Sequence, residues 1–166
     1  MLDVVVLEEV MIARTKLAAS LHMRGCLFDR VTIQGHIGSF DASLFGWTNE
    51  WGSTPARRAA VAAFYAKVDF ALDLTRVASG NFDLGDIPIE LVRPNPELHF
   101  RLDRDRADYD AIMNVEGVEY TMYPNDVRAL AESDRPSALL MANPKAKNFA
   151  LDLAALRSLR QRGFVT

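Results

Sequence analysis

The sequence predicts a single α+β domain, residues 1–166, with a mostly antiparallel sheet of about five to six strands. An N-terminal helix, a long second helix and a C-terminal helix are expected to pack on this sheet. Three observations predict this class. Apolar residues recur at helical spacing in three separated stretches, short alternating stretches lie between residues 87 and 142, and no linker or repeat divides the chain.

The first predicted element is a helix from about Leu7 to Arg24. Its apolar residues recur three and four positions apart, acidic and basic residues lie between them, and Gly25 follows as a stop signal. The next stretch, Arg30 to Ile37, alternates apolar Val31 and Ile33 with polar neighbours. This alternation predicts a short strand.

A second helix is predicted to begin at Thr54 and Pro55, because a hydroxyl cap before a proline at the first helical position is a typical helix start. The pattern is helical through Ala66. From Val68 to Thr75 the alternation suits a strand as well as a helix. We favour a helix that continues to about Ala78, with the strand as the open alternative.

The remaining elements are expected to be mainly strands. Glu116 and Gly117 separate two alternating stretches, which predicts a hairpin with a positive φ at Gly117. The full set of predictions for this part is strands at Ile87–Arg93, Leu98–Leu102, Tyr109–Val115, Val118–Tyr123 and Ala138–Ala142, and helices from Pro124 or Asn125 to Ser133 and from Lys147 to Arg162.

Composition and charge limit the partners of the chain. The net charge is −3, without the basic excess that nucleic-acid binders use to neutralise phosphates. Cys26 is the single cysteine, so no intramolecular disulfide forms. The longest apolar run, Ala59 to Ala66, is far shorter than a membrane span, and the start of the chain does not resemble a signal peptide. We expect a cytoplasmic protein that binds neither nucleic acid nor membrane.

The common catalytic and nucleotide-binding motifs are absent from the sequence. Carboxylates gather at residues 81–86 and 103–110, but arginines interleave the second run and both lack the pattern of a calcium loop. We interpret both as solvated turns and expect no metal and no cofactor. The basic residues after Pro144 are expected to stabilise the end of the last helix, with an anion-binding patch as the alternative.

An aromatic segment within residues 38–53 is the most distinctive feature of the sequence. Phe45, Trp47 and Trp51 lie close together with Asn49 among them. Rings with interspersed polar groups suit a ligand slot, and tryptophan is also enriched at subunit interfaces and over cores. The core or interface is the favoured interpretation, and a ligand-binding role for Phe45, Trp47, Asn49 and Trp51 is the alternative.

The sequence contains three histidines, and we consider each of them for acid–base or nucleophilic chemistry. His36 lies between two glycines just before the aromatic segment, where a general acid or base is often displayed, and Asp41 is its expected orienting partner. His22 and Cys26 are four residues apart, but Gly25 separates them, so a thiolate–imidazole pair is not favoured. His99 is expected to point away from the core.

Two functional hypotheses follow. The leading one is a non-catalytic binding or interaction domain that forms a homo-oligomer, with the aromatic segment at a pocket or an interface; a small molecule is the second partner considered. The alternative is a small-molecule enzyme in which His36 is the acid or base, Asp41 orients it, and Trp47 and Trp51 form the substrate walls.

Overall fold

A computed structural model describes residues 5–43, 54–79 and 81–166; within β2, the side chains of residues 14, 15 and 17–19 are not described. The chain forms two compact units. Unit 1 comprises Met1–Val77 and Phe82–Asn95, and unit 2 comprises Ala78–Asn81 and Pro96–Thr166. The single domain that the sequence predicts stays a prediction.

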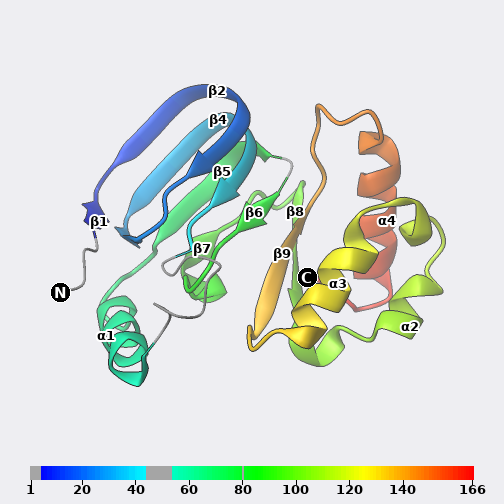
Figure 1. The fold of residues 1–166 in the computed structure, drawn as a ribbon. Helices are drawn as coiled ribbons and strands as arrows, with labels where there is room; N and C mark the ends of the chain where they lie inside the picture. Colours follow the sequence, from blue (N-terminus) through cyan, green and yellow to red (C-terminus); the bar gives the residue numbers. More distant parts are fainter. Residues whose placement is uncertain (1–4, 44–53, 80) are drawn as a thin grey trace. The chain divides into compact units, whose positions relative to one another are not determined.

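Unit 1 is built mainly from parallel strands that lie one above another (Figure 1). Each residue of β1 pairs with the residue twenty-one positions later in β3, as in Val5 with Cys26, and β2 pairs with β4 in the same direction. The chain therefore winds in coils, as in a parallel β-solenoid. The strands are β1 (Val5–Glu8), β2 (Met11–His22), β3 (Cys26–Asp29), β4 (Val31–Asp41), β5 (Leu72–Ser79), β6 (Phe82–Asp83) and β7 (Val92–Arg93).

Successive coils turn at the same place. Glu9 and Arg30 both adopt left-handed backbone, with φ of 54° and 55°, which is uncommon outside glycine. The Glu9 amide donates to the carbonyl of Asp29, and the Arg30 amide donates to the carbonyl of Phe70, each at 2.9 Å. The Arg30 guanidinium also forms ion pairs with Glu8, Glu9 and Asp29, so this corner is held by side chains as well as by backbone.

The interior of unit 1 is filled by the inward residues of these strands. Phe40 lies between Phe28 and Phe82, with ring centroids 6.3 and 5.2 Å apart, and Ile33 and Leu74 are fully buried. Stacked aromatic and branched side chains of this kind give a parallel sheet most of its stability.

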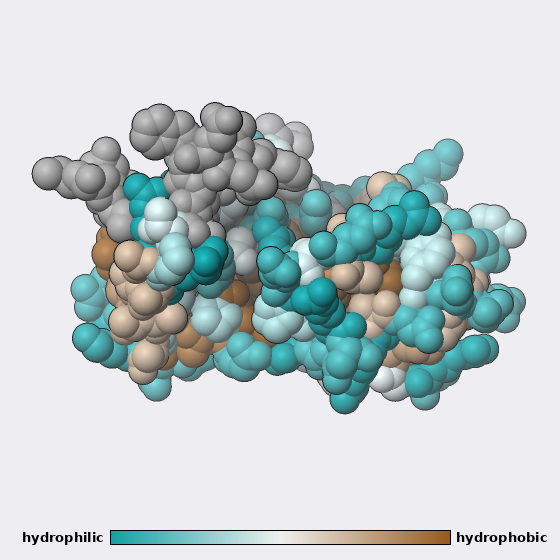
Figure 2. Space-filling model, turned by 60° about the horizontal axis from the view of Figure 1, so that its bottom comes forward, coloured by the Kyte–Doolittle hydropathy of each residue, from teal (hydrophilic) through white to brown (hydrophobic). Residues whose placement is uncertain are grey.

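Helix α1 (Pro55–Tyr65) belongs to unit 1. It begins as the sequence predicts, because the Thr54 hydroxyl accepts a hydrogen bond from the Arg57 amide at 3.3 Å and Pro55 follows the cap. Tyr65 at its end is buried. The exposed residues of α1 are mainly alanines, which give the weakly hydrophobic surface over this helix in Figure 2.

Unit 2 is an antiparallel pair of strands with helices on one side (Figure 1). Its core is continuous and includes fully buried Leu102, Ile112 and Leu156. The elements are β8 (His99–Asp103), α2 (Tyr109–Met113), α3 (Tyr123–Glu132), β9 (Ser137–Met141) and α4 (Phe149–Gln161), with short 3₁₀ turns η3 (Arg104–Arg106) and η4 (Val118–Tyr120); a further 3₁₀ turn, η2 (Ile89–Leu91), belongs to unit 1. No helix in the described part of the chain is long and apolar enough to cross a membrane.

The predicted mostly antiparallel sheet is wrong, because the main sheet is entirely parallel and only β8 and β9 pair antiparallel. The predicted N-terminal helix from Leu7 to Arg24 is also wrong: this stretch forms the end of β1, a corner at Glu9 and β2. Its helical spacing of apolar residues is overridden by pairing with β4, whose residues lie about twenty positions later. The second helix ends at Tyr65, and the strand alternative is correct from Leu72.

The predicted hairpin around Glu116 and Gly117 is wrong as well. Tyr109–Met113 is a helix, capped by the Asp108 carboxylate, which accepts from the Ala111 amide at 3.0 Å. Gly117 does have a positive φ of 86°, but it starts the 3₁₀ turn η4 rather than a two-residue hairpin. The strand predicted at Ile87–Arg93 is mostly the turn η2, with β7 at its end. His99 is buried rather than directed away from the core.

Candidate functional site

The residues proposed for ligand binding, Phe45, Trp47, Asn49 and Trp51, lie outside the described residues. The two proposed catalytic residues, His36 and Asp41, both lie on β4. The structure places them in different contacts. His36 pairs in register with Lys16, whereas Asp41 pairs with His22.

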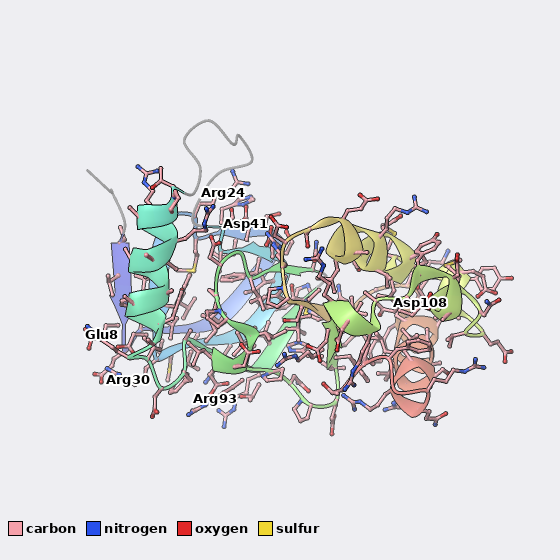
Figure 3. All side chains as sticks on the ribbon, turned by 90° about the horizontal axis from the view of Figure 1, so that it is seen from below. Glu8, Arg24, Arg30, Asp41, Arg93 and Asp108 are labelled. Atoms are coloured by element: carbon pink, nitrogen blue, oxygen red, sulfur yellow. The ribbon has the colours of Figure 1, made fainter. Side chains whose placement is uncertain are left out.

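The Asp41 carboxylate is the centre of a polar cluster at the carboxyl ends of β2 and β4. One oxygen, Oδ1, accepts from the Ser43 amide at 3.0 Å and from the Ser43 hydroxyl at 2.7 Å. The other, Oδ2, accepts from Arg24 Nε at 2.6 Å and lies 3.2 Å from His22 Nδ1. We call His22, Arg24, Asp41 and Ser43 the Asp41 cluster, and Figure 3 shows Arg24 and Asp41 side by side.

Strand pairing accounts for this cluster. His22 is the last residue of β2 and Asp41 the last residue of β4, and the parallel register brings them directly opposite one another. Arg24 follows in the turn after β2, and Ser43 follows β4. The carbonyl of Ser43 accepts from the Gly25 amide at 3.2 Å, which fixes the two chain segments together.

Electrostatics stabilise the charged form of Asp41. Its side chain is only 13% exposed, and this burial by itself disfavours a carboxylate. The hydrogen bonds from the Ser43 side chain and amide, from Arg24 and from His22 outweigh that cost and hold the pKa of Asp41 well below its usual value. Asp41 is therefore an anion at physiological pH.

The two cationic side chains of the Asp41 cluster reach solvent. The His22 side chain is 54% exposed and the Arg24 side chain 46% exposed. Because Asp41 engages His22 through Nδ1, the second ring nitrogen, Nε2, remains for another partner. An imidazole oriented by a carboxylate in this way is suited to proton transfer or to hydrogen bonding with a ligand.

The other chemical pairs considered from the sequence are arranged differently. No hydrogen bond joins His36 to Asp41, since the partners of that carboxylate are His22, Arg24 and Ser43. The Cys26 thiol contacts the carbonyl of Arg24 at 3.8 Å, and burial raises its pKa, which disfavours a reactive thiolate.

The acidic runs form no cation cage in the described part of the chain. Asp103 accepts from Arg101 Nε at 2.5 Å, and Asp108 caps α2. Among the described residues, no group of three or more His, Cys, Asp or Glu side chains is placed to hold a metal ion.

Unit 2 contains buried ionisable groups of another kind. Burial raises the pKa of Asp126 to about 6 and also raises the pKa of Asp152. Burial lowers the pKa of His99 to about 4, so this imidazole is neutral at physiological pH. The Tyr123 hydroxyl donates to the carbonyl of Met141 at 2.9 Å. His99 and Tyr123 are buried in the interior of the unit, whereas Asp126 and Asp152 are partly exposed.

The second candidate surface is apolar and lies on the first two strands of unit 1. Val5, Val6 and Met11 are 57%, 50% and 65% exposed, although large apolar residues elsewhere in the unit are mostly buried. All three belong to the first coil, which we define as residues 5–24. Among the described residues β1 pairs only with β3, and β2 is the end strand of the main sheet.

The sequence analysis selected Asp41 but predicted the wrong partner for it, His36 instead of His22. His22 had been placed on a helix, so its approach to a residue nineteen positions later was not expected. The available signal was the recurrence of similar stretches about twenty residues apart, which is typical of a solenoid. Comparison of the chain with protein-family models, curated proteins and solved structures finds no significant match.

Proposed function

We propose that this chain is a non-catalytic binding domain that associates with a second copy of itself through the first coil. The observation that carries the proposal is the exposure of Val5, Val6 and Met11 together on that coil. Large apolar side chains that are left exposed on one coil are typical of an interaction site.

The position of these residues in the fold supports the proposal. The end coil of a solenoid lacks a neighbour on one side, so its apolar residues need a cap or a partner. A second copy related by a two-fold axis would present the same apolar surface and would cover both ends at once. Such a pair is closed, because each copy uses its only first coil in the contact.

An extended peptide that adds to the edge of β2 is the other candidate partner for this coil. Two features of β2 disfavour it. The register between β2 and β4 shifts twice, between Ile12 and Thr15 and between Leu17 and Ser20. Lys16, near the middle of the strand, is exposed. Irregular edges and lysines are the usual protection against strand addition. The proposed contact therefore runs through apolar side chains and not through a continued ladder.

Sedimentation equilibrium at micromolar concentrations tests the proposal. The unmodified chain is expected to sediment as two copies, and Met11→Glu is expected to shift it toward the monomer, because the contact would bury a charge. Tyr120→Glu is the matched control. Tyr120 is 70% exposed but lies in unit 2, so the same change there should leave the dimer intact.

The aromatic segment is the competing contact surface. If Trp51→Glu dissociates the dimer and Met11→Glu does not, the subunit contact lies at the aromatic segment and the first-coil proposal is wrong. A chain that is monomeric at every accessible concentration would contradict self-association altogether.

A further inference from the structure

We infer that His22 and Arg24 form a binding site for an oxyanion, the carboxylate or phosphate group of a small molecule. This site is distinct from the apolar surface proposed for self-association. It consists of two basic side chains that one buried carboxylate, Asp41, holds next to each other at the carboxyl ends of β2 and β4; Figure 3 labels Arg24 and Asp41.

The donors of these side chains are only partly used. The Nε–H group of Arg24 donates a hydrogen bond to Asp41 at 2.6 Å, so the four N–H groups on its two terminal nitrogens remain for other acceptors. Among the described residues these terminal nitrogens and His22 Nε2 make no hydrogen bond. Both side chains are about half exposed, so the remaining N–H groups of Arg24 and the Nε2 atom of His22 are accessible from solvent.

The geometry is fixed before any ligand arrives. The amide and hydroxyl of Ser43 hold Asp41, and Asp41 in turn fixes Arg24 Nε and His22 Nδ1. A free arginine loses rotamer entropy when it binds an anion, whereas an arginine already held by a carboxylate loses less. The planar terminal nitrogens of a guanidinium match the two oxygens of a carboxylate or phosphate.

The charge of Asp41 is compatible with anion binding because its oxygens are saturated. They accept four hydrogen bonds, two from Ser43 and one each from Arg24 and His22. The positive charge of Arg24 offsets the negative charge of Asp41, so the cluster does not repel an anion.

Neighbouring groups make the surface around the cluster polar. Ser20 and Ser39 lie two residues before His22 and Asp41 on the same strands, and their hydroxyls are hydrogen-bonded to each other at 2.5 Å. Alternate residues of a strand share a face, so these hydroxyls flank the two cations. A ligand with hydroxyl groups next to its oxyanion, such as a phosphorylated or carboxylated sugar, suits this row.

The test uses the full chain and inorganic sulfate as the probe, because sulfate keeps its charge between about pH 5.5 and pH 8. Binding is measured by NMR titration of the arginine Nε–H and backbone amide signals. We expect saturable shifts at Arg24, His22 and Ser43. Arg24→Gln should weaken sulfate binding at least about tenfold, which corresponds to about 1.4 kcal/mol.

His22→Gln and Arg76→Gln complete the design. His22→Gln should also weaken sulfate binding, because it removes the imidazole that lies beside Arg24 on Asp41. Arg76 is exposed on β5, outside the cluster, so Arg76→Gln removes an equal charge and should leave the affinity within about twofold. Equal losses in Arg24→Gln and Arg76→Gln would mean non-specific attraction and would overturn the inference.

Two further measurements separate possible causes of failure. If Arg24→Gln does not fold, Arg24→Lys keeps the charge but not the second pair of donors, and should bind sulfate more weakly than the unmodified chain. Sulfate binding that is unchanged in Arg24→Lys or in His22→Gln would contradict the site. Met11→Glu should bind sulfate normally whether or not it dimerises, because the oxyanion site does not depend on self-association.

Discussion

The two units of this chain are stabilised in different ways. In unit 1, backbone ladders join strands that are about twenty residues apart in the sequence, as in the pairing of Leu7 with Phe28. In unit 2, most core contacts join short helices to a single pair of strands, and the buried side chains of α3 and α4 meet those of β8 and β9. The contrast shows that a repeating ladder needs little local sequence signal, whereas a helical core depends on amphipathic spacing in each helix.

Two aspartates illustrate the same difference in electrostatic terms. Asp41 in unit 1 is buried among hydrogen-bond donors, and its pKa lies below the usual value. Asp126 in unit 2 is buried without such donors in the described residues, and its pKa rises to about 6. Burial alone therefore does not decide the charge of a carboxyl group. The hydrogen bonds that the local backbone can offer decide it.

The largest expected effects come from truncating one core residue in each unit. Leu74→Ala in unit 1 and Leu156→Ala in unit 2 each remove a fully buried side chain, and each should cost about 3 kcal/mol of stability. Native-state hydrogen exchange should then show the greatest loss of protection in the unit that carries the substitution. Equal loss in both units would show that they unfold together and would support the single-domain prediction.

The close packing of unit 1 is tested by Gly85→Ala. Gly85 has a φ of +57°, and an added Cβ would lie 2.8 Å from the Cα of Ser43 and 2.9 Å from the carbonyl oxygen of Ala42. The change should cost about 2 kcal/mol or more, because both contacts are with backbone.

Gly117→Ala in unit 2 is the matched control for Gly85. Gly117 also has a positive φ, of +86°, but an added Cβ would meet only the side chain of Leu151 at 3.7 Å. The expected cost is about 1 kcal/mol, from backbone strain alone. Urea denaturation measures both values. If the two substitutions cost the same, the close approach at Gly85 contributes nothing.

The sequence predicted unit 2 better than unit 1. The helix predicted from Lys147 to Arg162 contains α4, and the strands predicted at Leu98–Leu102 and Ala138–Ala142 correspond to β8 and β9. The apolar residues of each of these elements recur at regular spacing within the element itself, so a local pattern is enough to predict them. The helix predicted over Leu7 to Arg24 was wrong because its stabilising partners lie in the next coil, beyond the range of any local pattern.

The candidate site was predictable to a similar extent. The sequence indicated Asp41 only as the expected orienting partner of His36, whereas its hydrogen-bond partners in the described residues are His22, Arg24 and Ser43. Its true neighbours, His22 and Arg24, could not be selected without the parallel register that places β2 beside β4. Alternation alone does not tell a parallel from an antiparallel neighbour.

Asp41→Asn is expected to destabilise unit 1 by about 1–2 kcal/mol at neutral pH, because an amide cannot accept all four hydrogen bonds. The pKa of Asp41 is lowered by folding, so its contribution is present above about pH 4, the range of an unfolded carboxyl, and is lost as the pH falls further. Thermal unfolding between pH 2 and pH 7 should show a flatter acid dependence for Asp41→Asn. The exposed Asp69→Asn is the control.

Asp126→Asn is expected to have the opposite and smallest effect, a gain of about 1 kcal/mol at pH 7.5. Folding raises the pKa of Asp126 to about 6, so the contribution of this group to stability is fully present below about pH 4 and is lost as the pH rises through 6. The substituted chain should not show this loss. No gain relative to the exposed Asp134→Asn would contradict the raised pKa.

The corner at Arg30 has a consequence for how this chain tolerates change in sequence. Its amide pairs with Phe70, forty positions later, whereas the corner before it pairs across about twenty, so α1 (Pro55–Tyr65) is inserted between two successive coils. The exposed residues of α1 can therefore be exchanged for other residues with little cost to the strands, whereas Tyr65 at its end is buried and has to be kept. The exposed side of α1 is the natural place in unit 1 for new binding properties to be acquired.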